Sequence, residues 1–149
     1  MDAVTYPQNS VVDFVNNKLI AMRLPSDSKP YADQYGVKWT PRLFLLDSTG
    51  APHHDTVGFL PPEEFIAAME LGEAKIDFDL DCLEDCSDHL NNVIGGPKTA
   101  AVPEALFMMG VVAYKKSGKA TPLKAAYEKL LAEFPDSEWT IRALPYRLL

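Results

Sequence analysis

The sequence has few cysteines and no long apolar run. Cys82 and Cys86 are its only cysteines, too few for the disulfide framework that stabilises many small secreted domains. No run approaches the roughly 20 apolar residues of a membrane-spanning helix. The start at Met1 also lacks the basic and apolar segments of a signal peptide. Taking Met1 as the start, we expect a cytoplasmic protein that has no membrane partner.

Basic residues are also scarce relative to acidic ones. The 149 residues include 14 Lys and Arg against 21 Asp and Glu, which gives a formal net charge of -7. This balance argues against a nucleic-acid partner, because nucleic-acid surfaces are themselves anionic. The sequence also lacks the Gly-x-Gly-x-x-Gly, phosphate-loop, Gly-x-Ser-x-Gly and His-Glu-x-x-His signatures. Several common enzyme classes are therefore excluded, and we expect no cofactor and no metal.

The sequence is nevertheless rich enough in apolar residues to fold. Hydrophobic residues make up 47% of it, which is sufficient for a sizeable core in one or two small domains. The most informative stretch begins at Gly36, which can end a helix in a left-handed conformation. Pro41 then forces Thr40 into extended geometry. Arg42–Leu46 is a short apolar run typical of a strand buried on both faces, although periodicity alone also allows a short buried helix.

A turn follows this run. Asp47 can accept hydrogen bonds from the backbone ahead of it, and Gly50 can adopt the positive φ of a three-residue hairpin loop. We therefore predict that Ala51–Phe59 is a second strand paired to the first. Around this hairpin the sequence predicts four further elements, namely a helix from Asn9 or Ser10 to Asn17, a strand over Leu19–Leu24, a short helix from Pro30 to Tyr35, and a helix that begins at Pro61-Pro62-Glu63-Glu64.

The pattern Val37-x-x-Thr40-Pro41 followed by Asp47-x-x-Gly50 resembles the second half of a thioredoxin-like domain. The resemblance covers Met1 to about Leu71 and implies an α/β thioredoxin-like fold. It also implies that the Thr40–Pro41 peptide is cis. In that family the matching loop contacts a substrate chain by backbone pairing, so Trp39, Thr40 and Pro41 are the predicted binding residues. An exposed Trp39 would favour binding, and a buried Trp39 would favour packing.

The sequence departs from the family at its start. The family's first strand and its Cys-x-x-Cys turn would lie just upstream of the matching residues, and neither follows Met1. That strand would lie between Leu19–Leu24 and Arg42–Leu46, and its absence would leave backbone groups unpaired. Three solutions are open: a native protein that begins further upstream, two chains that cover the gap by associating, or direct pairing of the two strands.

The second half of the sequence predicts only helices. We expect these over Glu73–Ile94, from Pro103 to Lys116, from Thr121 to Phe134, and from Glu138 to about Leu144. The residues Ala105-x-x-x-x-Gly110-x-x-x-Tyr114, followed by Tyr127-x-x-Leu130-x-x-x-Phe134-Pro135-Asp136-Ser137, resemble one tetratricopeptide repeat. The predicted organisation is thus a thioredoxin-like domain over residues 1–72 and a tetratricopeptide-like helical hairpin domain over residues 73–149.

Other candidate chemistry lies within Glu73–Ile94. A helix would place Cys82, Cys86 and His89 on one side, and thiolates and imidazole bind zinc. A tetrahedral site needs a fourth ligand, however, so we favour two small buried cysteines with His89 near the surface. A redox or disulfide role for Cys82 and Cys86 is the alternative. The six acids from Asp77 to Asp88 lack the spacing of a calcium loop and are typical of a solvated helix face.

Two histidines in the first half are adjacent, which makes them poor co-ligands. In a strand His53 and His54 point to opposite faces, and we expect both to be solvated or half-buried.

The leading functional hypothesis is a thioredoxin-like protein that binds protein or peptide and has no redox motif or catalytic residue in this sequence. One alternative is a thiol–disulfide oxidoreductase whose Cys-x-x-Cys lies upstream of Met1. Another is a structural module that associates with itself, for example as a homodimer.

Overall fold

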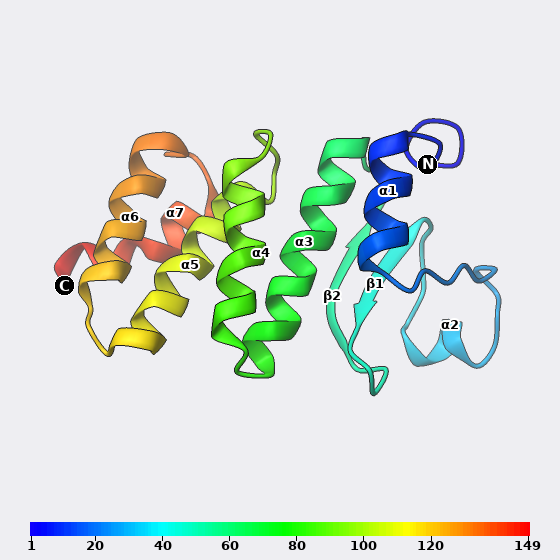
Figure 1. The fold of residues 1–149 in the computed structure, drawn as a ribbon, viewed down its shortest axis with the longest axis horizontal. Coiled ribbons are helices and arrows are strands. Elements are labelled where there is room, and N and C mark those ends of the chain that lie inside the picture. The colour runs from blue at the N-terminus through cyan, green and yellow to red at the C-terminus, as the bar shows by residue number, and fades with distance from the viewer. The chain divides into compact units, whose positions relative to one another are not determined.

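A computed structural model describes residues 1–149. These residues form two compact units, Met1–Ile66 and Ala67–Leu149. Helices dominate, and the only sheet has two strands (Figure 1). In chain order the elements are α1 (Asn9–Lys18), α2 (Tyr31–Gln34), β1 (Arg42–Leu46), β2 (Pro52–Val57), α3 (Pro62–Asp79), α4 (Leu83–Gly95), α5 (Val102–Ser117), α6 (Thr121–Glu133), α7 (Glu138–Ala143) and a 3-10 helix over Leu144–Leu148. None of the helices has both the length and the apolar character needed to cross a membrane.

The predicted hairpin is confirmed. Strands β1 and β2 are antiparallel, with Arg42 opposite Val57 and Leu45 opposite His54. The Asp47 carboxylate accepts hydrogen bonds from the Thr49 amide at 2.8 Å and from the Ala51 amide at 3.0 Å. Gly50 has a φ of 86°, which a residue with a side chain rarely adopts. Asp47 and Gly50 therefore form the turn in the way that was predicted from the sequence.

The expectation of a strand buried on both faces is only partly right. Arg42–Leu46 is a strand, which excludes the short helix, but Leu45 is its only buried residue and Leu46 is exposed. The physical reason is that a sheet of two strands has too little surrounding structure to cover both faces.

The predicted strand over Leu19–Leu24 is wrong. The chain leaves α1 in extended conformation at Leu19, but no strand other than β2 pairs with β1. Ile20 is fully exposed and Met22 is 78% exposed. Direct pairing of Leu19–Leu24 with β1, one of the three proposed solutions, does not occur. A strand needs a neighbour to satisfy its backbone groups, and this segment has none.

The core of the first unit is small. Val11 of α1, Leu45 of β1 and Phe65 of α3 are its buried apolar residues. The Thr5 hydroxyl donates to the Leu60 carbonyl at 2.5 Å, and Tyr6 packs edge-on against Phe65 with ring centroids 5.9 Å apart. These contacts fasten the segment before α1 to the start of α3.

The single helix predicted over Glu73–Ile94 is also wrong. Helix α3 begins at Pro62, as expected from the prolines and acids there, and continues through Gly72 to Asp79. The chain then turns at Asp81, whose φ is 62°, and α4 begins after Cys82. The predicted domain boundary between residues 72 and 73 therefore falls inside α3.

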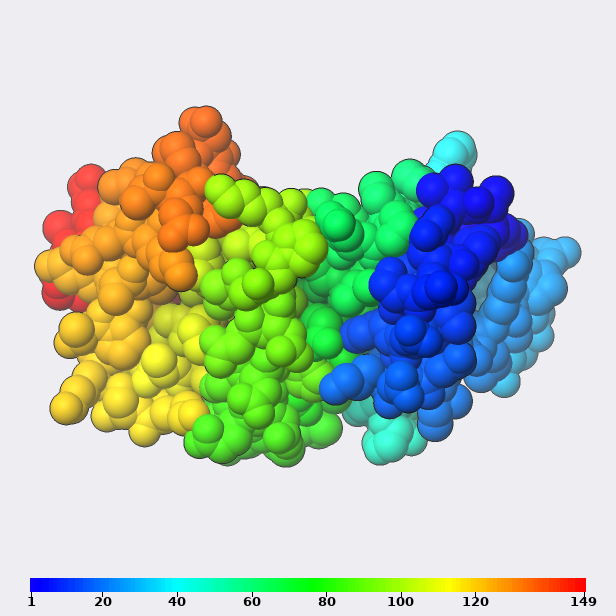
Figure 2. All heavy atoms as spheres, turned by 45° about the horizontal axis from the view of Figure 1, so that its top comes forward, coloured from blue at the N-terminus to red at the C-terminus, as the bar shows by residue number.

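The second unit contains the main core. Its buried members come from α3 to α7 and from Ala101, the residue before α5. They are Ala67, Leu71, Ala74, Cys86, Leu90, Val93, Ala101, Val102, Ala105, Leu106, Val112, Leu130 and Ala143. In the space-filling view the atoms of α4, α5 and α6 form neighbouring bands from green to orange (Figure 2). Two residues that were predicted to end or begin a helix do so. Gly118 is left-handed after α5, and the Ser137 hydroxyl accepts a hydrogen bond from Trp139 N–H at the start of α7.

Helices α5 and α6 pack closely against each other. A Cβ added at Gly110 would lie 2.5 Å from the Ala126 Cβ and 3.3 Å from the Pro122 carbonyl oxygen. Only glycine allows this approach between the two backbones. The contact is compatible with a helical hairpin, and the tetratricopeptide assignment stays a prediction.

Candidate functional site

The loop that carries the predicted binding residues is fastened at both ends. Gly36 has a φ of 60°, and the next amide, that of Val37, donates to the Ala32 carbonyl of α2 at 2.9 Å. After the loop, Gly58 N–H donates to the Pro41 carbonyl at 2.8 Å. The Thr40–Pro41 peptide is cis. Lys38, Trp39 and Thr40 therefore lie in a loop whose two ends are hydrogen-bonded to neighbouring segments.

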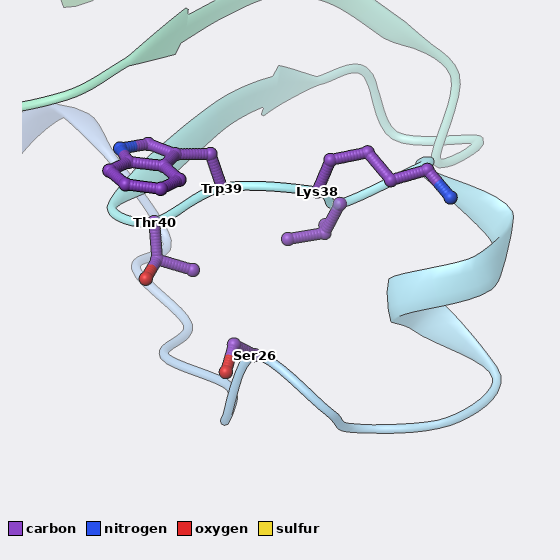
Figure 3. A pocket seen from close by; sticks show the side chains of 5 residues that line it. Ser26, Lys38, Trp39 and Thr40 are labelled. Carbon is purple, nitrogen blue, oxygen red and sulfur yellow. The ribbon is translucent and has the colours of Figure 1, made fainter.

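Trp39 is the most prominent side chain of this loop. It is 72% exposed, although an indole ring usually gains stability from burial. Trp39 borders an open hollow of about 290 Å³ that is also lined by Ser26, Val37, Lys38 and Thr40. Figure 3 shows Thr40 and Ser26 on facing segments of this hollow, while the Trp39 ring and the Lys38 chain extend in different directions along the loop. The structure thus brings the predicted residues Trp39 and Thr40 together beside a space.

The loop also presents backbone groups. The N–H groups of Lys38, Trp39 and Thr40 donate to no other backbone group. The neighbouring strand β1 pairs with β2 alone, so its second edge carries no strand. An extended peptide could therefore find donors and acceptors along both features, which is the requirement for strand addition.

The two histidines of β2 are half-buried, as expected. His53 Nε2 lies 3.2 Å from Asp47 Oδ2. Hydrogen bonds from the Thr49 hydroxyl, His53 and the Ala51 amide hold the pKa of the Asp47 carboxyl well below its usual range. This pair belongs to the turn of the hairpin, and its geometry indicates a structural role.

The cysteines occupy unlike surroundings. Cys82 is exposed just before α4, whereas Cys86 is completely buried within α4, and both thiols are free. Burial is the main reason that the pKa of the Cys86 thiol is raised to about 11, with a further contribution from Asp77. A thiol with so high a pKa is a poor nucleophile at neutral pH. The prediction that both cysteines are buried is thus correct for Cys86 and wrong for Cys82.

A polar cluster between α3 and α4 was missed by the sequence reasoning. Glu70 and Glu73 of α3 approach His89 of α4, and the three ligand atoms lie within 4.8 Å of one another. His89 Nδ1 is 2.6 Å from Glu70 Oε2 and 3.6 Å from Glu73 Oε2. On the other side of the ring, Nε2 lies 3.6 Å from Asp77 Oδ2. We call Glu70, Glu73, Asp77 and His89 the α3–α4 cluster.

One expectation about these residues needs correction. The His89 side chain is 18% exposed, so part of it lies at the surface as expected, while carboxylates of α3 cover the rest. Asp77 is half-buried and faces His89, so it is not part of a solvated helix face. Burial raises the pKa of the Asp77 carboxyl, opposed by His89 and reinforced by Asp85. The spacing of Glu70, Glu73 and Asp77, one and two turns apart on an apolar helix, was the signal available in the sequence.

Comparison with known proteins supports part of this assignment. Residues 3–73, a little under half of the chain, match the family model described as a thioredoxin-like domain. This match supports a thioredoxin-like family for the N-terminal part and fits an α/β region followed by helices. It does not extend to the helices that resemble a tetratricopeptide repeat. No curated protein and no solved structure matches the chain.

Proposed function

We propose that this thioredoxin-like protein binds an extended segment of another protein through the loop Trp39-Thr40-Pro41. The observation that carries the proposal is the exposure of Trp39, at 72%, beside the hollow that Thr40 also lines. Tryptophan is enriched among the few residues that dominate binding energy in protein interfaces. An exposed indole on a loop with hydrogen-bonded ends can therefore contribute a large contact area with little loss of backbone freedom on binding.

Backbone geometry supports an extended ligand rather than a helical one. The amides of Lys38, Trp39 and Thr40 donate to no backbone group, and no strand pairs with the second edge of β1. A peptide in β conformation could pair with these groups, while its alternate side chains would face Trp39 and the hollow. Exposed Ile20 and Met22 provide further apolar surface in the same unit.

The first experiment is selection of binding peptides from a random library displayed on phage, using the full chain as bait. A selected peptide is then labelled with fluorescein, and its affinity is measured by fluorescence anisotropy. We expect Trp39→Ala to weaken binding at least roughly tenfold, as truncation of a dominant interface residue does. Phe59→Ala is the matched control, because Phe59 is a 53% exposed aromatic residue of the same unit that does not line the hollow.

Equal affinity for the wild type and Trp39→Ala would refute the proposal. An equal loss in both variants would also count against it, because it would indicate a general effect of exposed aromatic residues. Since Trp39 is so exposed, Trp39→Ala should keep the wild-type circular dichroism spectrum, which separates loss of binding from loss of fold.

Self-association is a second candidate, and the open edge of β1 with the exposed Ile20 and Met22 favours it. Two chains could cover these surfaces by pairing edge to edge. Sedimentation velocity over a hundredfold concentration range would reveal a dimer. A dimer that Ile20→Ser/Met22→Ser dissociates would support self-association through this surface, and a monomer throughout would exclude it.

Redox chemistry by Cys82 and Cys86 receives no support from their surroundings, because one thiol is exposed and the other is buried with a pKa of about 11. With dithiothreitol as electron source, we expect the chain to reduce insulin no faster than the uncatalysed background. A faster rate that the Cys82→Ser/Cys86→Ser variant loses would show that the two cysteines form a redox pair.

A further inference from the structure

We propose that Glu70, Glu73 and His89 bind a divalent transition-metal ion, and that Zn²⁺ fits their donor set. The site lies between α3 and α4 and is distinct from the peptide-binding loop. Glu70 and Glu73 are one turn apart on α3 and so face the same side, where His89 of α4 meets them. The three donor atoms already lie within 4.8 Å of one another, so small side-chain rotations would bring them into one coordination sphere.

The types of ligand atom indicate which class of metal ion would bind. Imidazole nitrogen with carboxylate oxygens suits Zn²⁺ and similar first-row ions, whereas Mg²⁺ and Ca²⁺ prefer oxygen donors alone. Two donors about 2.1 Å from a tetrahedral zinc ion are about 3.4 Å apart. The 2.6 Å contact between His89 Nδ1 and Glu70 Oε2 would lengthen, since the metal would replace the proton that the two groups share. The 3.6 Å contact with Glu73 is already close to that spacing.

The α3–α4 cluster is rich in carboxylates. Three carboxylates, those of Glu70, Glu73 and Asp77, surround one imidazole. The Glu70 side chain is only 9% exposed, and burying a carboxylate away from water is costly unless positive charge or hydrogen bonds compensate. His89 and Asn92 supply this compensation to Glu70 without a metal, and a divalent cation would take over the part that His89 plays.

Neighbouring groups could orient the ligands. Asn92 Nδ2 donates to Glu70 Oε2 at 3.2 Å. Asp77 Oδ2 lies 3.6 Å from Nε2, the ring nitrogen of His89 that would not bind the metal. Histidine ligands usually donate their second N–H to a carboxylate or carbonyl, which fixes the tautomer and the ring orientation. With three protein ligands the fourth position of a tetrahedral site would be taken by water.

The test is isothermal titration calorimetry of the full chain with Zn²⁺, in a Cys82→Ser background that removes the exposed thiol. We expect one ion per chain. His89→Gln and Glu73→Gln should each weaken binding at least roughly tenfold, because loss of a ligand costs no less than loss of an orienting partner. His53→Gln is the matched control, since His53 also lies beside a carboxylate, that of Asp47. It should bind Zn²⁺ like the background protein.

A second measurement tests the proposal without any substitution, so it does not depend on whether a variant folds. In the unsubstituted chain labelled with ¹⁵N, only three histidines contribute imidazole signals. Addition of one equivalent of Zn²⁺ should shift the Nδ1 resonance of His89 and leave those of His53 and His54 in place. Mg²⁺ at the same concentration should shift none of them.

Several results would overturn the proposal. The first is no saturable binding of Zn²⁺, which would leave the α3–α4 cluster as ion pairs and hydrogen bonds only. Others are Zn²⁺ binding that His89→Gln does not weaken, a shift confined to His53 or His54, or equal responses to Mg²⁺ and Zn²⁺. Because these readouts do not involve the Trp39 loop, their failure would be separate from a failure of peptide binding.

Discussion

Asp47 shows how one side chain can determine a turn. Its Oδ1 accepts from the Thr49 amide, the Thr49 hydroxyl and the Ala51 amide, and its Oδ2 lies 3.2 Å from His53. All of these contacts favour the carboxylate over the neutral acid, so the pKa of Asp47 is lowered. The hairpin is therefore most stable when Asp47 is ionised.

This electrostatic preference gives the first prediction. A group with a lowered folded-state pKa stabilises the fold fully above its unfolded pKa, which is about 4 for aspartate. That stabilisation is lost as the pH falls from there through the lowered pKa. We expect Asp47→Asn to reduce the thermal midpoint at pH 7 and to reduce it progressively less as the pH falls below about 4. Differential scanning calorimetry across this range measures the gap, with the exposed Asp13→Asn as control. A gap that stays constant with pH would contradict the argument.

The second prediction concerns the two thiols. Since Cys82 is exposed and Cys86 is buried with a pKa of about 11, only Cys82 should react readily with a thiol reagent. We expect 5,5′-dithiobis-(2-nitrobenzoic acid) to modify one thiol per native chain and two after unfolding in guanidinium. Cys82→Ser should remove the fast reaction. Fast modification of both native thiols would show that Cys86 is accessible.

At the scale of elements, the pairing of α5 with α6 depends on one glycine. A Cβ at Gly110 would lie 2.5 Å from the Ala126 Cβ, a distance at which the two helices must move apart. Gly110 lies in the middle of a helix, where glycine is otherwise unfavourable. Its presence is explained by the close approach of the helices.

The third prediction follows from this contact. Gly110→Ala should lower the free energy of unfolding by about 1–3 kcal/mol, the usual cost of overpacking, despite the better helix propensity of alanine. Gly95→Ala is the matched control, because Gly95 ends α4 with open space where its Cβ would lie. Urea unfolding followed by circular dichroism gives both values. If Gly110→Ala were as stable as Gly95→Ala, α5 and α6 would not be packed as closely as described.

At the scale of the whole molecule, the two units differ in how much apolar surface they bury. The core cluster lies entirely between Ala67 and Ala143. The first unit buries mainly Val11, Leu45 and Phe65 around a two-stranded sheet, and such a sheet has little stability of its own. Opening of the first unit should therefore require less free energy than opening of the second.

The fourth prediction applies this difference to hydrogen exchange. Amides of β1 and β2 should exchange faster than those of α5 and α6, even though all of them lie in regular structure. Mass spectrometry of peptic fragments, sampled from seconds to hours at neutral pH, resolves the two groups. Equal protection in the hairpin and in α5 would mean that both units open only when the whole chain unfolds.

Local signals in the sequence predicted much of the fold correctly. The Asp47–Gly50 turn, the left-handed Gly36 and Gly118, the start of α3 at its prolines and the Ser137 cap were all readable. Each depends on the conformational limits of one residue or on hydrogen bonds within a few residues. The thioredoxin-like resemblance rested on such signals, and the family match over residues 3–73 supports it.

Which segments pair with or pack against one another was decided by the tertiary structure alone. Leu19–Leu24 has the composition of a strand, but no strand lies beside it, so it stays unpaired and exposed. The contact of His89 with Glu70 of α3, which is 19 positions away in the sequence, was not predicted. The sequence determined the turns and helix starts that depend on neighbouring residues, but it did not reveal the break between α3 and α4. The packing of segments that are distant in the sequence determined which backbone groups form hydrogen bonds and which charged side chains lie close together. Local sequence patterns do not encode these contacts.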